Sequence, residues 1–310
     1  MENSLIHPDR LVTVIVPCYN GAAFLEETLR SALAQSHPLV EILVIDDGST
    51  DGSCKIAERF PIRYIRQENR GLSEARNTGI RESRGTYVVF LDADDRLKPQ
   101  AIARGLRALD MRPDCAMAVG DHVFIAADGS HLANSAKQFD ISHHFETLLK
   151  SNFIEMISTV LFRRSVLEEV GGFNTALRVA EDYDLYLRIA RLHPICSHPA
   201  IVAEYRKHGA NTSLNSELML LTTLRVLKSQ ARYVKNNAWR LLAYCEGICT
   251  WRKQYGRQLA TELASGRLRV HHLRHKLLIL TAYYPQGLLL FGFLWIMRAM
   301  GQQRRVRISG

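Results

Sequence analysis

The 310-residue sequence lacks the short motifs of several common nucleotide-binding and metal-binding classes. It has no GxGxxG turn after its first apolar run and no Walker A lysine loop, which argues against a nicotinamide-dependent Rossmann enzyme and a P-loop nucleotidase. Its six cysteines are scattered, and the closest pair, Cys245 and Cys249, has the wrong spacing for a zinc knuckle or a redox CxxC. Because Glu2 and Asp9 interrupt any early apolar run, we expect no signal peptide, reduced cysteines and a cytoplasmic location.

Acidic residues are scarce in the last third of the chain. Residues 216–310 contain 16 Lys and Arg against 3 Glu and no Asp, a balance of +13. Residues 1–215 contain 24 basic and 28 acidic residues, a balance of −4. This asymmetry predicts two parts, a domain over 1–215 and a basic extension over 216–310 whose charge favours an anionic lipid surface or nucleic acid.

The extension also contains a long uncharged run, "LLILTAYYPQGLLLFGFLWIM" at 277–297. Its 21 residues are long enough to span a bilayer, but Pro285 and Gly287 interrupt it and basic residues flank it. We expect helices here, with the segment dipping into the surface of an anionic membrane. A helical cap or subunit interface and a true membrane span are the alternatives.

The first part alternates apolar, strand-like runs with segments of helical periodicity. "LVTVIVPCYN", "EILVIDDGSTDGS", "IRYIRQ" and "TYVVFLDADD" predict strands, with helices over 22–35 and 73–82 and further strands over 115–125 and 157–162. This alternation favours an α/β fold with a parallel sheet covered on both faces. Since ligands bind outside the carboxyl ends of such strands, we expect the site there.

Carboxylates cluster at these strand ends. Asp92 and Asp94 lie two residues apart, on the same side of an extended backbone, and would suit Mg²⁺ or Mn²⁺ together with phosphate oxygens. Asp47 follows another strand and could accept a hydrogen bond from a base or ribose. An acidic helix-capping loop and a simple Asp/Gly/Ser turn are the structural alternatives.

Two helical segments supply further polar residues. "GLSEARNTGI" has a possible cap at Ser73 and places Arg76 near the acids, where it could contact a phosphate or remain a solvated charge. In "GGFNTALRVAEDYDLYLRIA", Glu181 and Asp182 fall at a helix N-terminus. The helix dipole favours ionised carboxylates there, which suits a general base, although Asp182 could also serve as a cap.

The sequence resembles the family 2 glycosyltransferases of the GT-A fold, which are inverting enzymes, over roughly residues 11–213. The motifs that carry the resemblance occur in the same order: "VIVPCYNGAAFLEETLRSALAQ", "EILVIDDGSTDGS", "GLSEARNTGI", "YVVFLDADD", "GGF…EDYDLYLR" and "YRKHGANTS". The resemblance implies a Rossmann-like GT-A domain, followed by the helical C-terminal extension. Asn174 stands where the family often has an acid, so acceptor contacts at that position are not implied.

The resemblance also implies roles for single residues. It places Pro17, Tyr19 and Asp47 in the pocket for the nucleotide base, Asp92 at the ribose and Asp94 at a Mn²⁺ or Mg²⁺ ion. His208 resembles a late histidine that approaches the metal or diphosphate, with a surface histidine as the alternative. Asp182 resembles the catalytic base, supported by Glu181.

The expected function is inverting transfer of a hexose or N-acetylhexosamine from a nucleoside-diphosphate donor, with UDP as the expected nucleotide. The expected acceptor is a hydroxyl of a glycan or lipid-linked precursor of cell-surface polysaccharide or lipopolysaccharide. We expect the protein at the inner face of the cell membrane and no nucleic-acid partner. The alternatives are a sugar-nucleotide pyrophosphorylase, which would need a Gly-rich basic loop after the first strand, and an inactive membrane-bound scaffold.

Overall fold

The computed structural model describes residues 10–135, 143–209, 215–264 and 270–295. The chain divides into two compact units, Met1–Leu148 with Asn152–Asn211 and Leu149–Ser151 with Thr212–Gly310. Residues 210–213 of the "YRKHGANTS" motif and residues 296–297 of the uncharged run lie outside the described residues.

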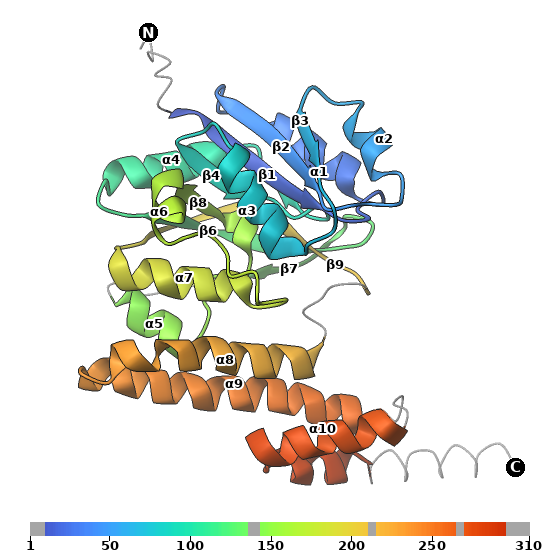
Figure 1. The fold of residues 1–310 in the computed structure, drawn as a ribbon, viewed down its shortest axis with the longest axis vertical. Helices are drawn as coiled ribbons and strands as arrows, with labels where there is room; N and C mark the ends of the chain where they lie inside the picture. The colour runs from blue at the N-terminus through green and yellow to red at the C-terminus, as the bar shows by residue number, and fades with distance from the viewer. Residues whose placement is uncertain (1–9, 136–142, 210–214, 265–269, 296–310) are drawn as a thin grey trace, which may run out of the picture. The chain divides into compact units, whose positions relative to one another are not determined.

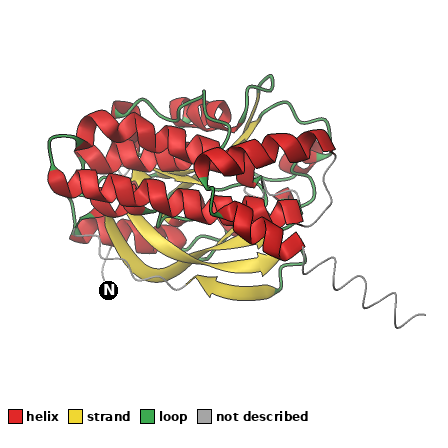
Figure 2. Ribbon diagram, turned by 90° about the horizontal axis from the view of Figure 1, so that it is seen from below, coloured by secondary structure: helices red, strands yellow, loops and turns green. Residues whose placement is uncertain are grey.

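The strands, yellow in Figure 2, all belong to the first unit. Their bounds are β1 Val12–Cys18, β2 Val40–Asp46, β3 Arg63–Arg66, β4 Tyr87–Phe90, β5 Arg96–Leu97, β6 Met117–Ala126, β7 His131–Ser135, β8 Val160–Arg163 and β9 Cys196–Lys207. All seven residues of β1 are buried, as its continuous apolar run predicts for a strand covered on both faces.

The helices of the first unit follow the expected alternation with strands, with shifted ends. They are α1 Leu25–Leu33, α2 Ser53–Ala57, α3 Leu72–Glu82, α4 Ala101–Met111, α5 His144–Lys150 (whose last two residues fall in the second unit), α6 Arg164–Glu169 and α7 Glu181–Leu192. A 3₁₀ turn, η2, covers Ile157–Thr159. The predicted cap at Ser73 is wrong: α3 begins at Leu72 after Gly71, whose φ of 90° a glycine tolerates.

The strands form one mixed sheet in the order β3-β2-β1-β4-β8-β6-β9-β5, with β7 paired to β6 (Figure 1). The expectation of a parallel sheet holds for β3, β2, β1 and β4. It is wrong for β8, which runs antiparallel to both β4 and β6, and for the antiparallel pairs β5–β9 and β6–β7, whereas β6 and β9 pair in parallel. The carboxyl ends of β1 and β2 lie side by side, since Cys18 is in register with Asp46.

Helices cover both faces of this sheet. Leu25 and Leu29 of α1 and Ile102 of α4 pack in one cluster with alternate residues of β1. On the other face Gly79 of α3 lies so close to Ile15 that a Cβ on it would come within 2.3 Å of that side chain. The sheet therefore presents its strand ends between two helical layers.

The second unit contains α8 Ser216–Val234, α9 Ala238–Ala264 and α10 Val270–Tyr283, and residues 287–295 are also helical. The Asn215 side chain caps α8 by accepting a hydrogen bond from the Leu218 amide at 3.1 Å. The uncharged run is thus split into two helices around Pro285. In the part of the chain described here, no helix combines the length and apolar character needed to cross a membrane.

Candidate active site

The three acids after β4 lie in a turn. The amide of Asp95 donates to the carbonyl oxygen of Asp92 at 3.0 Å, so the expectation of an extended backbone here is wrong. Asp92 and Asp94 remain partly exposed, with 33% and 30% of their side chains accessible, whereas Asp95 is buried at 1%. The turn therefore presents Asp92 and Asp94 to solvent and buries Asp95.

Arg76 joins this turn to the start of α7. Its guanidinium donates to Asp92 Oδ1 at 2.7 Å and to Glu181 Oε1 at 2.6 Å, and it lies over the Phe173 ring with its Cζ 5.2 Å from the centroid. Arg76 is 2% exposed, and the two carboxylates raise the pKa of its guanidinium against the cost of burial. A buried arginine shared by two acids fixes their separation, because losing either contact would leave charge unpaired.

His208 and Asp94 form a second pair. His208 Nε2 lies 2.8 Å from Asp94 Oδ2. Burial, followed by the charge of Asp92, raises the pKa of Asp94, and the hydrogen bond to His208 lowers it. The two side chains thus lie in contact although they are 114 positions apart in the sequence.

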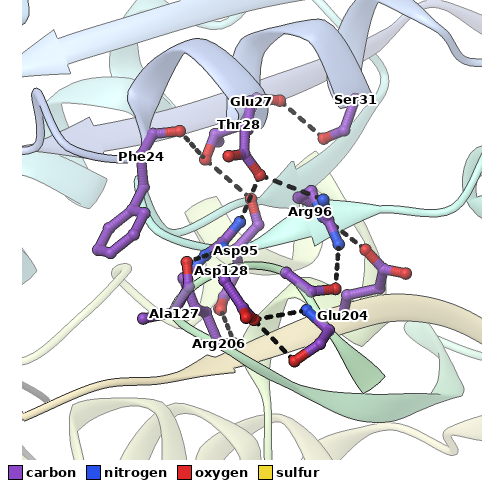
Figure 3. A network of polar contacts seen from close by, with 12 residues as sticks. Phe24, Glu27, Thr28, Ser31, Asp95, Arg96, Ala127, Asp128, Glu204 and Arg206 are labelled. Carbon is purple, nitrogen blue, oxygen red and sulfur yellow. Dashed lines mark hydrogen bonds and ion pairs between the residues drawn. The ribbon is translucent and has the colours of Figure 1, made fainter.

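Arg206 holds the turn after β4 through its backbone and its side chain. Its amide donates to Asp95 Oδ1 at 2.8 Å (Figure 3). Its Nε donates to the Asp94 carbonyl at 2.8 Å. Its other terminal groups donate to Glu27 Oε2 at 2.7 Å and to the Ala127 carbonyl at 2.8 Å. Since Arg206 is fully buried, it fixes the backbone from which the Asp94 side chain projects.

Asp182 occupies the first turn of α7 beside Glu181. Its side chain is half-buried, and burial together with the charge of Glu181 raises the pKa of Asp182 to about 7, against the lowering effect of Arg76. Ala180, which precedes the helix, has a φ of 55°, a left-handed conformation that costs an alanine about 1 kcal/mol. A carboxylate with a pKa near neutrality on a strained helix start is suited to proton transfer.

The turn before α7 that contains Gly172 positions the Phe173 ring, which Arg76 contacts. Asn77 donates to the Phe173 carbonyl at 2.9 Å and accepts from the Phe173 amide at 2.7 Å. Gly172 has a φ of 67°, and a Cβ there would lie 2.4 Å from Asn77 Oδ1. Arg188 of α7 donates to the Gly172 carbonyl at 2.6 Å. The "GGF" motif thus places the phenyl ring on which Arg76 rests.

The residues assigned to the base pocket lie at the ends of β1 and β2. Pro17 is buried within β1, and Tyr19 just beyond it is 56% exposed. Asp47 is buried, and its carboxylate accepts hydrogen bonds from Gln67 Nε2 at 2.7 Å and from the Arg70 and Gly71 amides at 2.9 and 2.8 Å. Asp47 therefore shapes the loop before α3, and its contact with a base stays a prediction.

Sequence reasoning missed the supporting residues. Arg206 lies near the end of β9 and His208 just beyond it, two positions later in the sequence, a spacing that could have signalled a shared site. Glu27 gave no such signal, because it occupies an ordinary helical position and reaches Arg206 across 179 residues of sequence.

The donor set at Asp94 and His208 fits a hard divalent cation. The 2.8 Å between Asp94 Oδ2 and His208 Nε2 is close to the roughly 3 Å between neighbouring ligand atoms of a six-coordinate ion with bonds of about 2.1 Å. Across residues 10–135, 143–209, 215–264 and 270–295, no three His, Cys, Asp or Glu side chains form a complete metal cage. The other ligands would be phosphate oxygens and water, as is usual for Mg²⁺ at nucleotide sites.

Comparison with known proteins identifies the family. The sequence model described as "Glycosyl transferase family 2" matches residues 13–171. An uncharacterized glycosyltransferase of Rickettsia prowazekii is 31% identical over 225 residues, 69% of this chain and 70% of that protein. TuaG of Bacillus subtilis, named for teichuronic acid biosynthesis, is 39% identical over 58% of this chain and 72% of its own length. Chondroitin synthase of Escherichia coli is 28% identical over 69% of this chain, which matches 31% of that longer protein.

Solved structures show the same fold. S. aureus TarS 1-349 in complex with UDP matches with a TM-score of 0.63 at 18% identity, covering 94% of this chain and 92% of that one. The mannosyltransferase PcManGT from Pyrobaculum calidifontis, in complex with GDP-Man and Mn²⁺, matches with a TM-score of 0.60 at 23% identity, covering 95% and 86%. The predicted GT-A-like α/β fold with a helical C-terminal region is therefore confirmed. The chain belongs to glycosyl transferase family 2, whose members named above include enzymes of polysaccharide biosynthesis.

Proposed function

We propose that the chain transfers a sugar, with inversion, from a nucleoside-diphosphate donor to a hydroxyl of a glycan or lipid-linked acceptor. The observation that carries this proposal is Arg76, which joins Asp92 to Glu181 and so brings the start of α7 to the acidic turn after β4. The residues of this site all lie in 1–215, which we propose as the catalytic domain, with 216–310 as its helical extension.

Asp182 acts as the general base in this proposal. Its carboxylate takes the proton from the acceptor hydroxyl while the hydroxyl oxygen forms a bond to the anomeric carbon of the donor. The bond from that carbon to the diphosphate breaks at the same time, and the nucleoside diphosphate leaves. One displacement from the opposite face inverts the anomeric centre. Burial, followed by the charge of Glu181 that Arg76 holds in place, raises the pKa of Asp182 to about 7, so Asp182 can accept a proton near that pH.

The donor occupies the ends of β1, β2 and β4. We assign Pro17, Tyr19 and Asp47 to the base, Asp92 to the ribose, and Asp94 with His208 to the diphosphate and its cation. Mn²⁺ or Mg²⁺, when bound, would neutralise the charge of the leaving diphosphate. Arg76 was expected to contact a phosphate, but its bonds to Asp92 and Glu181 make positioning of these acids the role that we now favour.

The donor is proposed to be a UDP-sugar carrying a hexose or an N-acetylhexosamine. TarS has been solved with UDP and UDP-GlcNAc, whereas the archaeal mannosyltransferase has been solved with GDP-Man. The relatives named for chondroitin and teichuronic acid synthesis support an acceptor in cell-surface polysaccharide or lipopolysaccharide assembly. Such acceptors would place the enzyme at the inner face of the cell membrane.

A donor panel tests this proposal. The full chain is incubated with UDP-, GDP- and TDP-sugars and Mn²⁺ without acceptor, and release of nucleoside diphosphate is measured. We expect slow hydrolysis of UDP-sugars that stops on chelation of the metal and in the Asp94→Asn variant. Formation of a sugar 1-phosphate and nucleoside triphosphate from added pyrophosphate would instead identify a pyrophosphorylase. Failure to bind or hydrolyse any donor would favour an inactive scaffold.

A further inference from the structure

The helical unit exposes large apolar side chains along the uncharged run. Leu278 of α10 is 70% exposed, and Leu289 and Phe293 of the following helix are 80% and 61% exposed. Leu289 and Phe293 are four residues apart and lie on one face of their helix. Trp295 is also 58% exposed. Exposed apolar side chains that form one patch mark a binding surface, and Leu289 with Phe293 supplies such a pair on one helix face.

Basic side chains lie next to this apolar group. A Cβ on Gly256 of α9 would lie 2.6 Å from Tyr284, so α9 contacts the chain between the two apolar helices at that point. Arg252, Lys253 and Arg257 surround Gly256 in α9 and are exposed. Arg274 is exposed one turn before Leu278 on α10. Exposed positive side chains therefore lie on α9 around its contact with Tyr284 and on α10 one turn before Leu278.

This positive charge is not balanced within the extension. Residues 216–310 contain three acidic side chains, and each engages another group. The three pairs are Glu217 with His275 at 2.9 Å, Glu246 with Lys150 at 3.0 Å and Glu262 with Lys276 at 2.7 Å. Because residues 216–310 contain 16 basic and three acidic side chains, the extension keeps a net positive charge that an anionic partner can neutralise.

We propose that these residues form a docking surface for an anionic membrane interface. The docking surface consists of the apolar Leu278, Leu289, Phe293 and Trp295 and the basic Arg252, Lys253, Arg257 and Arg274. The apolar side chains would enter the boundary between headgroups and acyl chains, and the basic ones would contact anionic headgroups. This proposal goes beyond the transfer reaction and does not depend on the chemistry assigned to Asp182.

A second copy of the chain is a poorer occupant of the docking surface. A two-fold dimer joins the same patch from both copies, so it would bring two sets of basic side chains together. Like charges facing each other across an interface are unfavourable, whereas a bilayer rich in phosphatidylglycerol offers the opposite charge and an apolar interior.

Vesicle flotation of the full chain tests the docking surface. We expect at least tenfold more binding to phosphatidylcholine vesicles with 30 mol% phosphatidylglycerol than to phosphatidylcholine alone, and a marked loss at 0.5 M salt. The L289E/F293E variant should lose binding to both kinds of vesicle. The R252E/K253E variant should bind anionic vesicles at least 25-fold less, from about fivefold per removed charge.

Matched variants separate docking from general surface effects. M111E/L192E changes two exposed apolar residues of α4 and α7, and R104E/R107E reverses two exposed charges of α4. Both should bind vesicles within twofold of the wild type, and every variant should keep wild-type UDP binding, which distinguishes loss of docking from loss of the fold.

Two results would overturn the proposal. One is a wild-type chain that binds neither vesicle, or binds both equally. The other is a dimer in sedimentation equilibrium that L289E/F293E dissociates while vesicle binding persists, because the surface would then be an interface between copies.

Discussion

At the scale of single residues, the turn after β4 concentrates three carboxylates, and each contacts a donor from another element. The partners are Arg76 for Asp92, His208 for Asp94 and the Arg206 amide for Asp95. Without such partners the like charges would raise one another's pKa values and resist burial. These contacts explain how three carboxylates can lie together at the end of one buried strand.

Asp182→Asn should abolish transfer while leaving donor binding nearly intact. The substitution removes the proposed base but keeps the size of the side chain. The wild-type rate should fall about tenfold per pH unit below pH 7, because protonation of Asp182 removes the base. Initial rates between pH 5 and 9, with UDP binding by calorimetry, would check this. Loss of UDP binding in a folded variant would contradict the base role.

The same variant should change the pH dependence of stability. An aspartate in the unfolded chain has a pKa of about 3.9, below the folded value of about 7 for Asp182. The folded state therefore binds the extra proton, and wild-type stability should fall as the pH rises from about 4 to 7. Asp182→Asn removes this cost, so its gain in unfolding free energy should be larger at pH 8 than at pH 4 by on the order of 3 kcal/mol. An equal difference at both pH values in urea denaturation would refute a raised pKa.

Glu27→Gln should weaken metal binding without changing any proposed ligand. Glu27 accepts hydrogen bonds from Arg206 at 2.7 Å and Arg96 at 3.1 Å, so the substitution removes the charged partner of the guanidinium that also donates to the Asp94 carbonyl. We expect Mn²⁺ affinity in the presence of UDP to fall about tenfold, roughly 1.4 kcal/mol, by electron paramagnetic resonance. Glu26→Gln is the matched control, because Glu26 pairs with the exposed Arg30 and Arg59. Equal affinities in both variants would show that Arg206 does not position Asp94.

At the scale of elements, the start of α7 depends on the turn before it. Two hydrogen bonds join Asn77 to the Phe173 backbone, Gly172 lies against the Asn77 side chain, and the Phe173 ring supports Arg76. Arg76 in turn holds Glu181 in the first turn of α7. A disturbance of the glycine turn should therefore reach the proposed base through this series of contacts.

Gly172→Ala should be more damaging than Gly171→Ala. Both glycines have positive φ, 67° and 76°, so either substitution should cost about 1 kcal/mol from the backbone. The new Cβ at 172 would also overlap Asn77 Oδ1, whereas that at 171 meets no atom within 4 Å. We expect Gly172→Ala to lose roughly 3 kcal/mol of stability and about tenfold in turnover, with thermal unfolding and initial rates as readouts. Equal effects at 171 and 172 would argue against a link from Asn77 to Arg76.

The sequence predicted the parts of the fold that depend on local pattern. The apolar run of β1 and the helical periodicity of α7 each specify an element, because the spacing of apolar residues within a short segment shows whether a strand or one face of a helix is buried. The sequence did not predict the antiparallel direction of β8 or the turn at Asp92–Asp95. Both depend on contacts with residues that are distant in the sequence. For the same reason Arg206 and Glu27 were missed. Asp94 was proposed from its position after a strand and from motif resemblance, and His208 from motif resemblance alone; the structure brings the two side chains together.

At the scale of the whole molecule, the chain combines a mildly acidic part over residues 1–215, proposed as the catalytic domain, with a strongly basic part over residues 216–310. The first unit holds every residue proposed to touch the donor. The second holds the docking surface proposed for an anionic membrane. Such a division lets one part perform the transfer and the other hold the enzyme where a lipid-linked acceptor would be found.

In the proposed mechanism, Asp94 and His208 hold one cation against the donor diphosphate while Asp182 faces the acceptor. A crystal grown with Mn²⁺ and UDP and measured at the manganese absorption edge would locate that cation. We expect one anomalous peak within about 2.0–2.3 Å of an Asp94 oxygen and a His208 nitrogen, bridged to the diphosphate. Ordered UDP with its manganese bound away from both residues would contradict it.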